Sequence, residues 1–411
     1  MRRGGRNYYA LDVSNRADPK FMWSVKGGTG DFGELGQSWS KPTLAKIQIG
    51  TNDPQQVLIF AGGYDPSQDD KTVREADQSG RALYFVDALN GSLIWKGGLG
   101  TVQPATGHHE TFADMNYSFP SDLIAISDNN DLLSQIYVGD MGGRVWRFDI
   151  NNGLNRSDLV DGGIIADFGK DGSEADARRF YSAPDLSLAQ INGEKTINVA
   201  IGSGYRAHPL DTVIEDKFFM FRYPYAKRNP ATYGLKRADN SYKPITYLDD
   251  LYDTTLNLIG EGTDQQVEDA ETALAGKHGW YINMDEAGEM ILGKSNTLNN
   301  VIRFISYSPM LNTEAANICD PNLGGSNYWA INLDDATPVE RVDENGDKVS
   351  VSREDRKSDV PGGGLAPPVT TVFIEKDGDV VVTDTTGPQV IREWGDIPLL
   401  RRWYWAEDPE L

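Results

Sequence analysis

A loosely repeated pattern of short strand-like segments is the feature that most constrains how this chain can fold. Segments rich in aromatic and β-branched residues each lead into a polar turn, at residues 8–23, 83–95, 144–153, 218–224 and 327–338. Trp23 and Trp95 stand where the chain resumes a strand after such a turn. The 43 glycines and 20 prolines fall between the segments rather than in one block, which favours a fold with many turns. Repeated β-rich units of this kind are typical of β-propellers.

We therefore predict an all-β fold, a modified β-propeller with long decorated loops and a small α-helical insertion. Asp12, Asp87 and Asp149 follow successive strands, and they are spaced more widely than the roughly 40 to 50 residues of compact propeller repeats. The blades should therefore carry long loops. We expect residues 1–411 to form a single propeller domain. Because the chain opens directly in strand-like sequence, we also expect it to be the C-terminal domain of a longer protein.

Residues 240–278 are predicted to be the α-helical insertion. Thr263 and Gln266 have the spacing of a capping box at the start of a helix, and Gly276 would end that helix. A flexible loop is expected at residues 353–368, whose last part reads PGGGLAPP. The dipeptides Asn345-Gly346 and Asp377-Gly378 predict two β-hairpins, since both accept the positive φ angles of tight turns.

The charge and the motifs exclude several classes of function. With 39 Lys and Arg against 61 Asp and Glu, the net charge of −22 would repel nucleic acid and anionic lipid. No apolar run approaches the roughly 18 residues that would indicate a membrane-spanning helix. The four histidines lack the spacing of a helical zinc site, and the single cysteine, Cys319, has no histidine nearby in sequence. We predict a protein that is not an enzyme.

Acidic segments are candidates for calcium, which binds six to eight oxygen atoms. In residues 125–140, Asp128, Asn130, the carbonyl of Leu132 and Ser134 alternate, and Asp131 can compete as a ligand. Two further segments qualify less well. Residues 62–80 contain Asp65, Asp69, Asp70 and Asp77, and residues 343–354 contain Asp343, Asn345, Asp347 and Glu354. For both segments we favour a turn-forming role over calcium binding, because Asp and Asn are common in turns, and we interpret residues 343–354 as a plain hairpin turn.

The segment LYFVDALNGSLIW, residues 83–95, resembles the tryptophan-docking repeat of quinoprotein dehydrogenase propellers. The resemblance implies an alternative function, an enzyme that uses pyrroloquinoline quinone (PQQ). The same pattern also serves as structure, and Trp23 and Trp95 are then expected to pack between blades, where a large apolar side chain stabilises the core.

A second resemblance rests on an ordered series of motifs between about Gly4 and Tyr307. They are GDFGELGQSWSKP (30–42), FAGGYDPSQDD (60–70), YSFPSD followed by IYVGDMGGRVWRFDI (117–150), RRFYSAPD (178–185), GSGYRAHPLDT (202–212), DKFFMFR (216–222) and GWYIN (279–283). Together they resemble the C-terminal β-propeller domain of the PilC/PilY family, type IV pilus biogenesis and tip-associated proteins. None of the motifs has catalytic meaning. Within them, Arg147 and Asp149 are candidates for an interface pair, but we expect them to be solvated, as charges at strand ends usually are. We expect Arg206 to brace its Gly-rich turn rather than bind a ligand.

This resemblance implies a protein at the cell surface, at the pilus tip or in the outer membrane. It implies a part in pilus extension, adhesion to host or abiotic surfaces and twitching motility. The implied partners are minor pilins or the pilus tip complex. It also implies calcium binding by the loop before IYVGD, at residues 127–135 here. This loop is one residue short and has Ser127 or Ser134 where the family has carboxylates, so calcium binding and a solvated turn remain alternatives.

Overall fold

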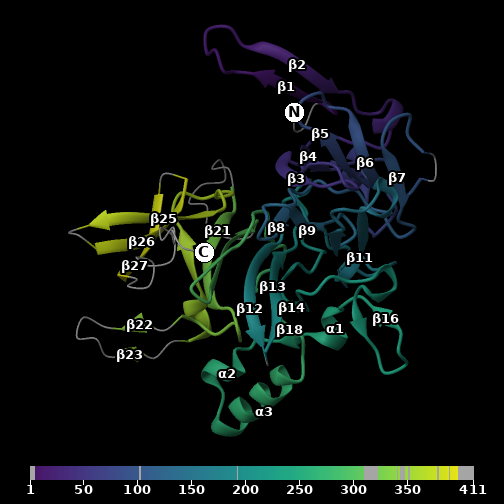
Figure 1. Cartoon of the computed structure of the whole chain (residues 1–411). Helices are drawn as coiled ribbons and strands as arrows, with labels where there is room; N and C mark the ends of the chain where they lie inside the picture. The colour runs from purple at the N-terminus through teal and green to yellow at the C-terminus, as the bar shows by residue number, and fades with distance from the viewer. Residues whose placement is uncertain are drawn as a thin grey trace, which may run out of the picture.

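The chain folds as a series of β-sheets that follow one another along the sequence. The computed structural model describes residues 5–100, 103–191, 193–309, 323–339, 341–342, 348–349, 352–376, 379–387 and 389–396 (Figure 1). An N-terminal hairpin of β1 (Tyr8–Asp12) and β2 (Lys20–Val25) precedes the first sheet. The first sheet is built from β3 (Thr43–Ile47), β4 (Gln55–Ala61), β5 (Ala82–Asp87), β6 (Leu93–Gly98) and β7 (His108–Thr111).

The later sheets repeat this plan. The second contains β8 (Ile124–Ser127), β9 (Leu133–Gly139), β10 (Arg144–Ile150) and β11 (Val160–Asp167). The third contains β12 (Asp185–Ile191), β13 (Glu194–Gly202), β14 (Lys217–Pro224), β18 (Gly279–Asn283) and the short β17 (Tyr252–Asp253). The fourth contains β19 (Asn296–Leu298), β20 (Val301–Ser308), β21 (Gly325–Asn332) and β24 (Lys357–Val360). The fifth contains β25 (Val369–Lys376), β26 (Asp379–Thr386) and β27 (Gln389–Asp396).

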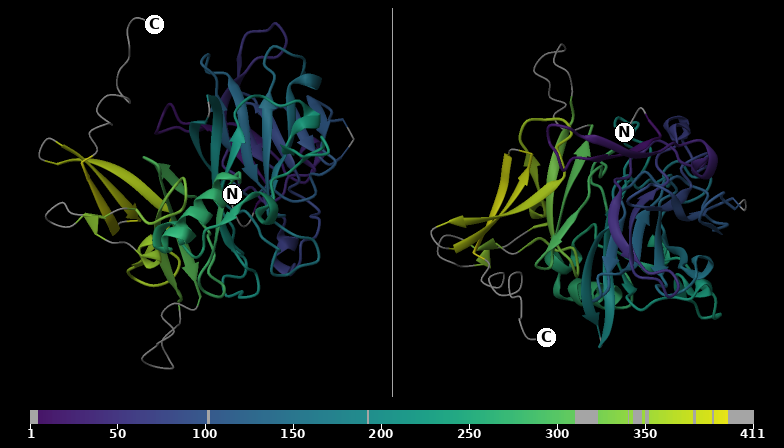
Figure 2. Two further views of the ribbon diagram at one scale, coloured as in Figure 1. Left: turned by 90° about the horizontal axis from the view of Figure 1, so that it is seen from below. Right: turned by 45° about the horizontal axis from the view of Figure 1, so that its top comes forward.

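Each sheet is mainly an antiparallel meander whose first strand lies towards the middle of the molecule. Strand β3 contacts β8 and β9, β12 contacts β19, and β19 contacts β25. The first and fifth sheets stand on opposite sides of the molecule, with the other sheets between them (Figure 2). This radial order is that of a β-propeller and not of a closed barrel, which confirms the predicted fold class.

The apolar core is divided into layers between neighbouring sheets. Trp95 and Phe148 belong to the layer between the first two sheets, Phe168 and Phe219 to the next, and Trp280 to the layer between the third and fourth. Trp95 is fully buried and Trp23 is 8% exposed, so the prediction that both pack in the core is confirmed. Because the middle sheets are covered on both faces, β9 and β20 are buried along their whole length.

This double coverage overturns the prediction that Arg147 and Asp149 are solvated. Both side chains are completely buried, with Arg147 Nη2 2.7 Å from Asp149 Oδ1. Arg147 also donates to the carbonyls of Pro224, Tyr225 and Ala226, at the end of β14 in the third sheet and just after it. The polar face of β10 is therefore an interface between two sheets rather than a face in contact with water.

The α-helices of the described residues all lie in the interval 240–278. They are α1 (Tyr247–Asp250), α2 (Leu258–Glu261) and α3 (Asp264–Ala275), and two-residue strands β15 (Leu235–Lys236) and β16 (Tyr242–Lys243) precede them. The helix predicted from its capping box is confirmed: the Thr263 backbone N–H donates to Gln266 Oε1 over 3.0 Å, and Gly276 follows the last turn. No helix in the described parts of the chain is long and apolar enough to span a membrane.

Short 3-10 helices occur at η1 (Gly30–Phe32), η2 (Pro66–Asp70), η3 (Arg156–Asp158), η4 (Pro230–Thr232) and η5 (Arg353–Arg356). Helix η5 and β24 occupy residues 353–360, within the segment predicted to be a flexible loop. In this part of the segment β24 pairs with β21, and Arg356 is buried and donates to the Asn257 side chain. The two predicted hairpins form as β22 (Arg341–Val342) with β23 (Lys348–Val349), and as β25 with β26. Their turns, Asn345-Gly346 and Asp377-Gly378, and Cys319 lie outside the described residues.

Candidate functional site

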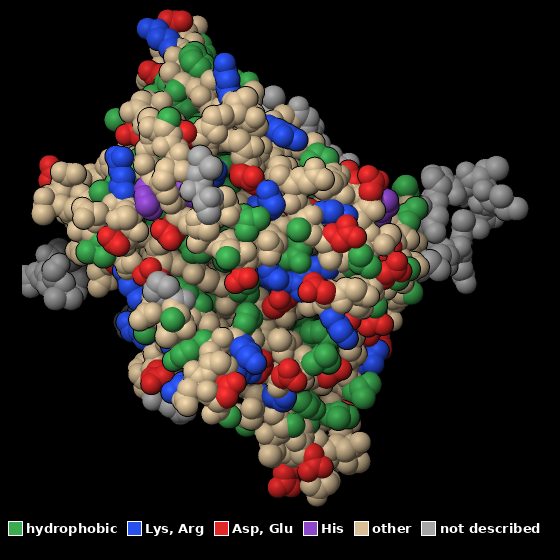
Figure 3. All heavy atoms as spheres, turned by 90° about the vertical axis from the view of Figure 1, so that its right-hand side faces the viewer, with side chains coloured by type: hydrophobic (Ala, Val, Ile, Leu, Met, Phe, Trp, Pro, Cys, Tyr) green, Lys and Arg blue, Asp and Glu red, His purple; other side chains and the backbone are tan. Residues whose placement is uncertain are grey.

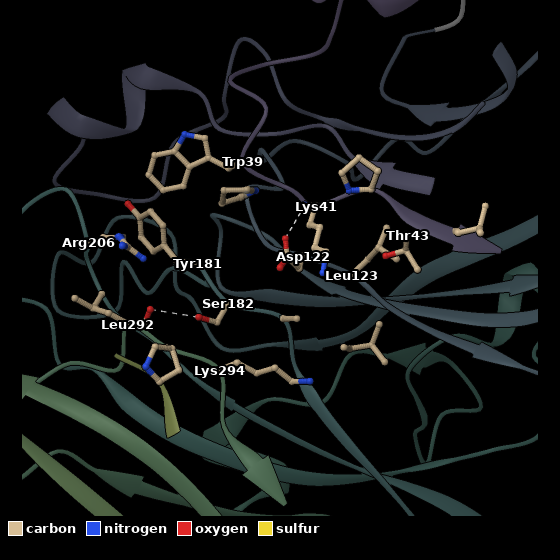
Figure 4. A pocket seen from close by; sticks show the side chains of 17 residues that line it. Trp39, Lys41, Thr43, Asp122, Leu123, Tyr181, Ser182, Arg206, Leu292 and Lys294 are labelled. Atoms are coloured by element: carbon tan, nitrogen blue, oxygen red, sulfur yellow. Dashed lines mark hydrogen bonds between the residues drawn. The ribbon is translucent and has the colours of Figure 1, made fainter. Parts of the chain in front are cut away.

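A cavity of about 570 Å³ lies where the sheets converge, and we call it the central pocket (Figure 4). Its walls are the segments that lead into the first strands of all five sheets, together with Arg206 from the loop after β13. They contribute Trp39 and Lys41 before β3, Asp122 before β8, Tyr181 and Ser182 before β12, Lys294 before β19 and Pro368 before β25. Residues more than 300 positions apart therefore share one wall because the radial order of the sheets brings the strand starts together.

Three cations and one carboxylate line the central pocket. The cations are Lys41, Arg206 and Lys294, and the carboxylate is Asp122. Asp122 is held in place because its Oδ1 accepts the Lys41 backbone N–H over 2.7 Å. Lys294 Nζ is 3.6 Å from Oδ1 of Asp185, whose pKa is raised by burial and lowered to a smaller extent by hydrogen bonding to Thr297 and by the Lys294 charge.

An aromatic cluster forms the other end of the central pocket. The ring of Trp39 stacks on Tyr64 with their centroids 4.6 Å apart, and Tyr181 lies 6.1 Å from Trp39. The indole N–H of Trp39 donates to Gln37 Oε1 over 3.2 Å. In Figure 4, Trp39, Tyr181 and Arg206 stand together, and Lys294 lies across the cavity from Trp39. The pocket thus has an aromatic end and a mixed-charge end.

The loops around this end of the molecule are fastened to one another through Arg179. Its guanidinium donates to Gln68 Oε1 (3.0 Å) and to the carbonyl of Lys71 (2.6 Å), and it lies 3.9 Å over the ring of Tyr205. The Tyr205 hydroxyl donates to the Gln68 carbonyl over 2.9 Å. Three of the motifs that resemble the PilC/PilY family, which contain Gln68, Arg179 and Tyr205, therefore meet in one buried network beside the central pocket.

Sequence reasoning missed the central pocket, although the pocket is built from motifs that it had singled out. Arg206, which we expected only to brace its turn, lines the cavity. A sequence signal for the pocket does exist. Pro42, Pro184 and Pro368 directly precede β3, β12 and β25, and proline is tolerated at the first position of a strand because it cannot donate to the ladder.

The acidic loop, residues 128–132, is the hairpin turn between β8 and β9. Asp128 Oδ1 accepts the backbone N–H groups of Asn130 (2.9 Å) and Leu132 (3.0 Å), and the Asp128 N–H donates to the Leu132 carbonyl (2.8 Å). Asp131 has a φ of +60°, and its Oδ2 is 2.6 Å from Lys46 Nζ. Ser134 is buried in β9, whereas the residues from Asp128 to Asp131 are exposed.

These residues offer calcium a partial set of ligands. Two carboxylates, the Asn130 amide and the Leu132 carbonyl lie on one short turn, but calcium needs six to eight oxygens. The Lys46 ammonium already neutralises Asp131 and would have to leave before a cation could bind there. In the described parts of the chain, no three side chains of His, Cys, Asp or Glu are grouped as a metal centre. Calcium at Asp128, Asn130, Asp131, Leu132 and Ser134 stays a prediction.

The second acidic segment has structural roles in this fold. Asp65 caps η2 and accepts the backbone N–H groups of Ser67, Gln78 and Ser79. Asp77 accepts from Gln68, from Lys71 and from the backbone of Ser118. Both carboxylates are buried, and their hydrogen bonds hold the loop rather than present it to a cation. Asp343, Asn345 and Asp347 of the third segment lie outside the described residues.

Comparisons with known proteins agree with the resemblance seen in the motifs. The type IV pilus biogenesis factor PilY1 of Pseudomonas aeruginosa strain UCBPP-PA14 is 29% identical over 157 residues, which are 38% of this chain and 11% of that protein. PilY1 of strain PAO1 is 28% identical over 159 residues, 38% of this chain and 12% of that protein. This chain therefore matches only about a tenth of the length of these relatives. No family model matches the sequence.

A comparison with solved structures shows that this chain also shares its fold with PilY1. The crystal structure of the P. aeruginosa PilY1 C-terminal domain superposes with a TM-score of 0.61 and 16% identity, and covers 95% of this chain and 78% of that one. A quinohemoprotein alcohol dehydrogenase from Comamonas testosteroni reaches a TM-score of only 0.31 at 11% identity, covering 86% of this chain and 42% of that one. That value is too low to support the quinoprotein alternative. The chain is therefore similar in sequence to PilY1, a protein of the PilC/PilY family, and it has the fold of the PilY1 C-terminal domain.

Proposed function

We propose that this chain acts in type IV pilus biogenesis as a non-catalytic assembly domain. The observation that carries the proposal is the match to PilY1, in sequence over 157 residues and in fold over 95% of the chain. The buried network of Gln68, Arg179 and Tyr205 supports it, because it fixes the loops at one end of the propeller in a single arrangement. A rigid set of loops on a β-scaffold is suited to binding another protein.

At a finer level, the partners would be minor pilins or other components of the pilus tip, met at the cell surface or outer membrane. The domain would favour pilus extension, and through it adhesion to host or abiotic surfaces and twitching motility. The test uses the source organism with the whole gene deleted. Pili sheared from the cells are quantified by immunoblot after complementation with the full-length wild-type gene or with one that lacks residues 5–396.

We expect pili to be restored by the full-length gene and not by the truncated one. A matched control, the full-length gene with Arg222→Met on the surface of the third sheet, should restore pili fully. Immunoblots of the encoded proteins must show equal amounts. Normal pili with the truncated gene, together with failure of the purified domain to retain any minor pilin, would contradict the proposal.

The regulatory part of the proposal is calcium binding by the acidic loop. Asp128 and Asp131 would supply the charge, while Asn130, the Leu132 carbonyl and Ser134 would complete the ligand set. Support comes from the two exposed carboxylates on one turn. Isothermal titration of calcium into chelator-treated protein, repeated with magnesium and with the double variant Asp128→Ala/Asp131→Ala, tests it. Calcium-selective heat that the double variant abolishes is expected, and equal binding of both ions by wild type and variant would contradict it.

A further inference from the structure

Basic residues outnumber acidic residues around the central pocket, whereas acidic residues outnumber basic residues in the chain as a whole. The chain carries 61 acidic against 39 basic residues, and on the face shown in Figure 3 the two signs are interspersed without a large patch of either. A second cavity, of about 750 Å³, is acidic like the chain as a whole. Its lining contains no Lys or Arg but includes Glu110, Asp114, Asp158 and Asp161. The central pocket is instead lined by three cations, Lys41, Arg206 and Lys294, and by a single carboxylate, that of Asp122.

This concentration of cations is a product of the fold. Lys41, Arg206 and Lys294 come from segments next to three different sheets, so no local sequence preference places them together. Lys294 lies 3.6 Å from Asp185 Oδ1, but the residues that line the cavity still carry an excess of positive charge. A cavity lined by one sign of charge attracts ligands of the opposite sign. The volume of about 570 Å³ lies within the range of roughly 300 to 1,000 Å³ typical of sites for small organic ligands and exceeds what a bare ion needs.

The remaining residues that line the central pocket indicate which other chemical groups the anionic ligand has. Trp39 offers an aromatic surface at one end, while Leu123 and Leu292 add apolar contact. Asp122 would repel a dianion such as phosphate or sulfate, but it can accept hydrogen bonds from hydroxyl groups. A ligand with one carboxylate, several hydroxyls and an apolar ring face matches all three kinds of wall.

We propose that the central pocket binds a carboxylated sugar, such as a hexuronate unit of an acidic polysaccharide. The sugar ring packs at the Trp39 end, its hydroxyls face Asp122 and Ser182, and its carboxylate lies among Lys41, Arg206 and Lys294. This inference goes beyond a role in pilus assembly, since it assigns a saccharide ligand to the central pocket.

The test is isothermal titration of the whole chain with three probes: trigalacturonate, the neutral trisaccharide galactotriose, and sodium sulfate. We expect trigalacturonate to bind at least tenfold more tightly than the other two. Lys294→Glu should weaken trigalacturonate binding by at least tenfold, and its unchanged thermal unfolding would show that it folds. Lys195→Glu is the matched control, because Lys195 is exposed on the hairpin at the opposite end of β12, and this variant should bind like wild type.

Each other result counts against the proposal. Equal binding of galactotriose would mean that the cations take no part, and equal binding of sulfate would reduce the pocket to a general anion site. Equal weakening by Lys195→Glu and Lys294→Glu would assign the effect to net charge. Cells that carry Lys294→Glu should keep wild-type amounts of surface pili, so the saccharide site and the assembly role are tested separately.

Discussion

Replacing Arg147 with methionine should destabilise the fold more than any exposed arginine would. The variant keeps most of the side-chain volume but removes the partner of Asp149, whose Oδ1 is 2.7 Å from Arg147 Nη2 in a fully buried setting. It also removes the donor to the carbonyls of Pro224, Tyr225 and Ala226. Breaking a buried ion pair by removing one partner costs about 3–5 kcal/mol, because the remaining charge stays uncompensated.

The Asp149 carboxylate would not be stranded completely. Its Oδ2 still accepts the Tyr233 hydroxyl over 2.7 Å and the Arg228 backbone N–H over 3.3 Å. These bonds limit the cost of Arg147→Met. In Asp149→Asn the Arg147 guanidinium keeps its three carbonyl acceptors, so this variant should be the milder of the two. The double variant should be more stable than the sum of the two single losses implies, by about 1–3 kcal/mol. This coupling distinguishes loss of the ion pair from a simple packing defect.

The assay is urea unfolding at pH 7 followed by tryptophan fluorescence and far-UV circular dichroism, with midpoints compared at constant slope. Arg222→Met is the control. It changes the same residue type in β14 of the third sheet. Arg222 is 22% exposed and its partner, Asp334, is 65% exposed, so loss of this pair should cost about 0–1 kcal/mol. A loss below about 1 kcal/mol for Arg147→Met, or strict additivity in the double variant, would refute the reasoning.

Three further predictions follow from single sites. Burial raises the pKa of Asp216 to about 6, above its unfolded value. Between about pH 4 and 6 the carboxyl therefore ionises in the unfolded chain while it stays protonated in the folded protein, and the free energy of unfolding should fall as pH rises through this window. Urea unfolding across the window should show Asp216→Asn gaining up to ~3 kcal/mol relative to wild type. Lys46→Met should strengthen calcium binding up to about fivefold in titration, because an exposed pair is worth about 0–1 kcal/mol, and unchanged affinity would mean that Asp131 is no ligand. Gly91→Ala should lower the urea midpoint more than Gly153→Ala. Both glycines have a positive φ, but a Cβ at Gly91 would lie 2.6 Å from the Trp23 ring, whereas a Cβ at Gly153 would have no atom within 4 Å. Equal losses of stability would show that the contact with Trp23 does not cause the effect.

The features that sequence could predict are those that depend on local chemistry. The helix α3 begins at the Thr263 and Gln266 capping box because two side chains three residues apart are enough to define its start. Trp95 is buried because a side chain of that size in a β-rich repeat has no other favourable place. Such inferences need a window of only a few residues.

The features that sequence could not predict depend on which surfaces the fold covers. In β10, Trp146 and Phe148 alternate with Arg147 and Asp149, a pattern that ordinarily indicates one buried and one solvated face. In this fold the next sheet covers the polar face as well. The same happens in β20, where buried Arg303 reaches Asp384 of the fifth sheet over 2.7 Å. Alternation shows that two faces differ in polarity, and it does not show that one of them meets water.

The two candidate sites lie at opposite ends of a single short strand. Asp122 and Leu123, just before β8, line the central pocket, and the acidic loop begins at Asp128, just after it. Strand β8 pairs along its length with β9, whose seven residues are all buried. Because this strand pair lies between the acidic loop and the pocket, a substitution in the loop should leave the shape of the pocket unchanged. The loop has an Asx turn and a Lys46 ion pair that hold it without metal. Loss of carboxylates from this loop should therefore abolish the proposed calcium site while the pocket and the interlocked loops around Arg179 keep their geometry.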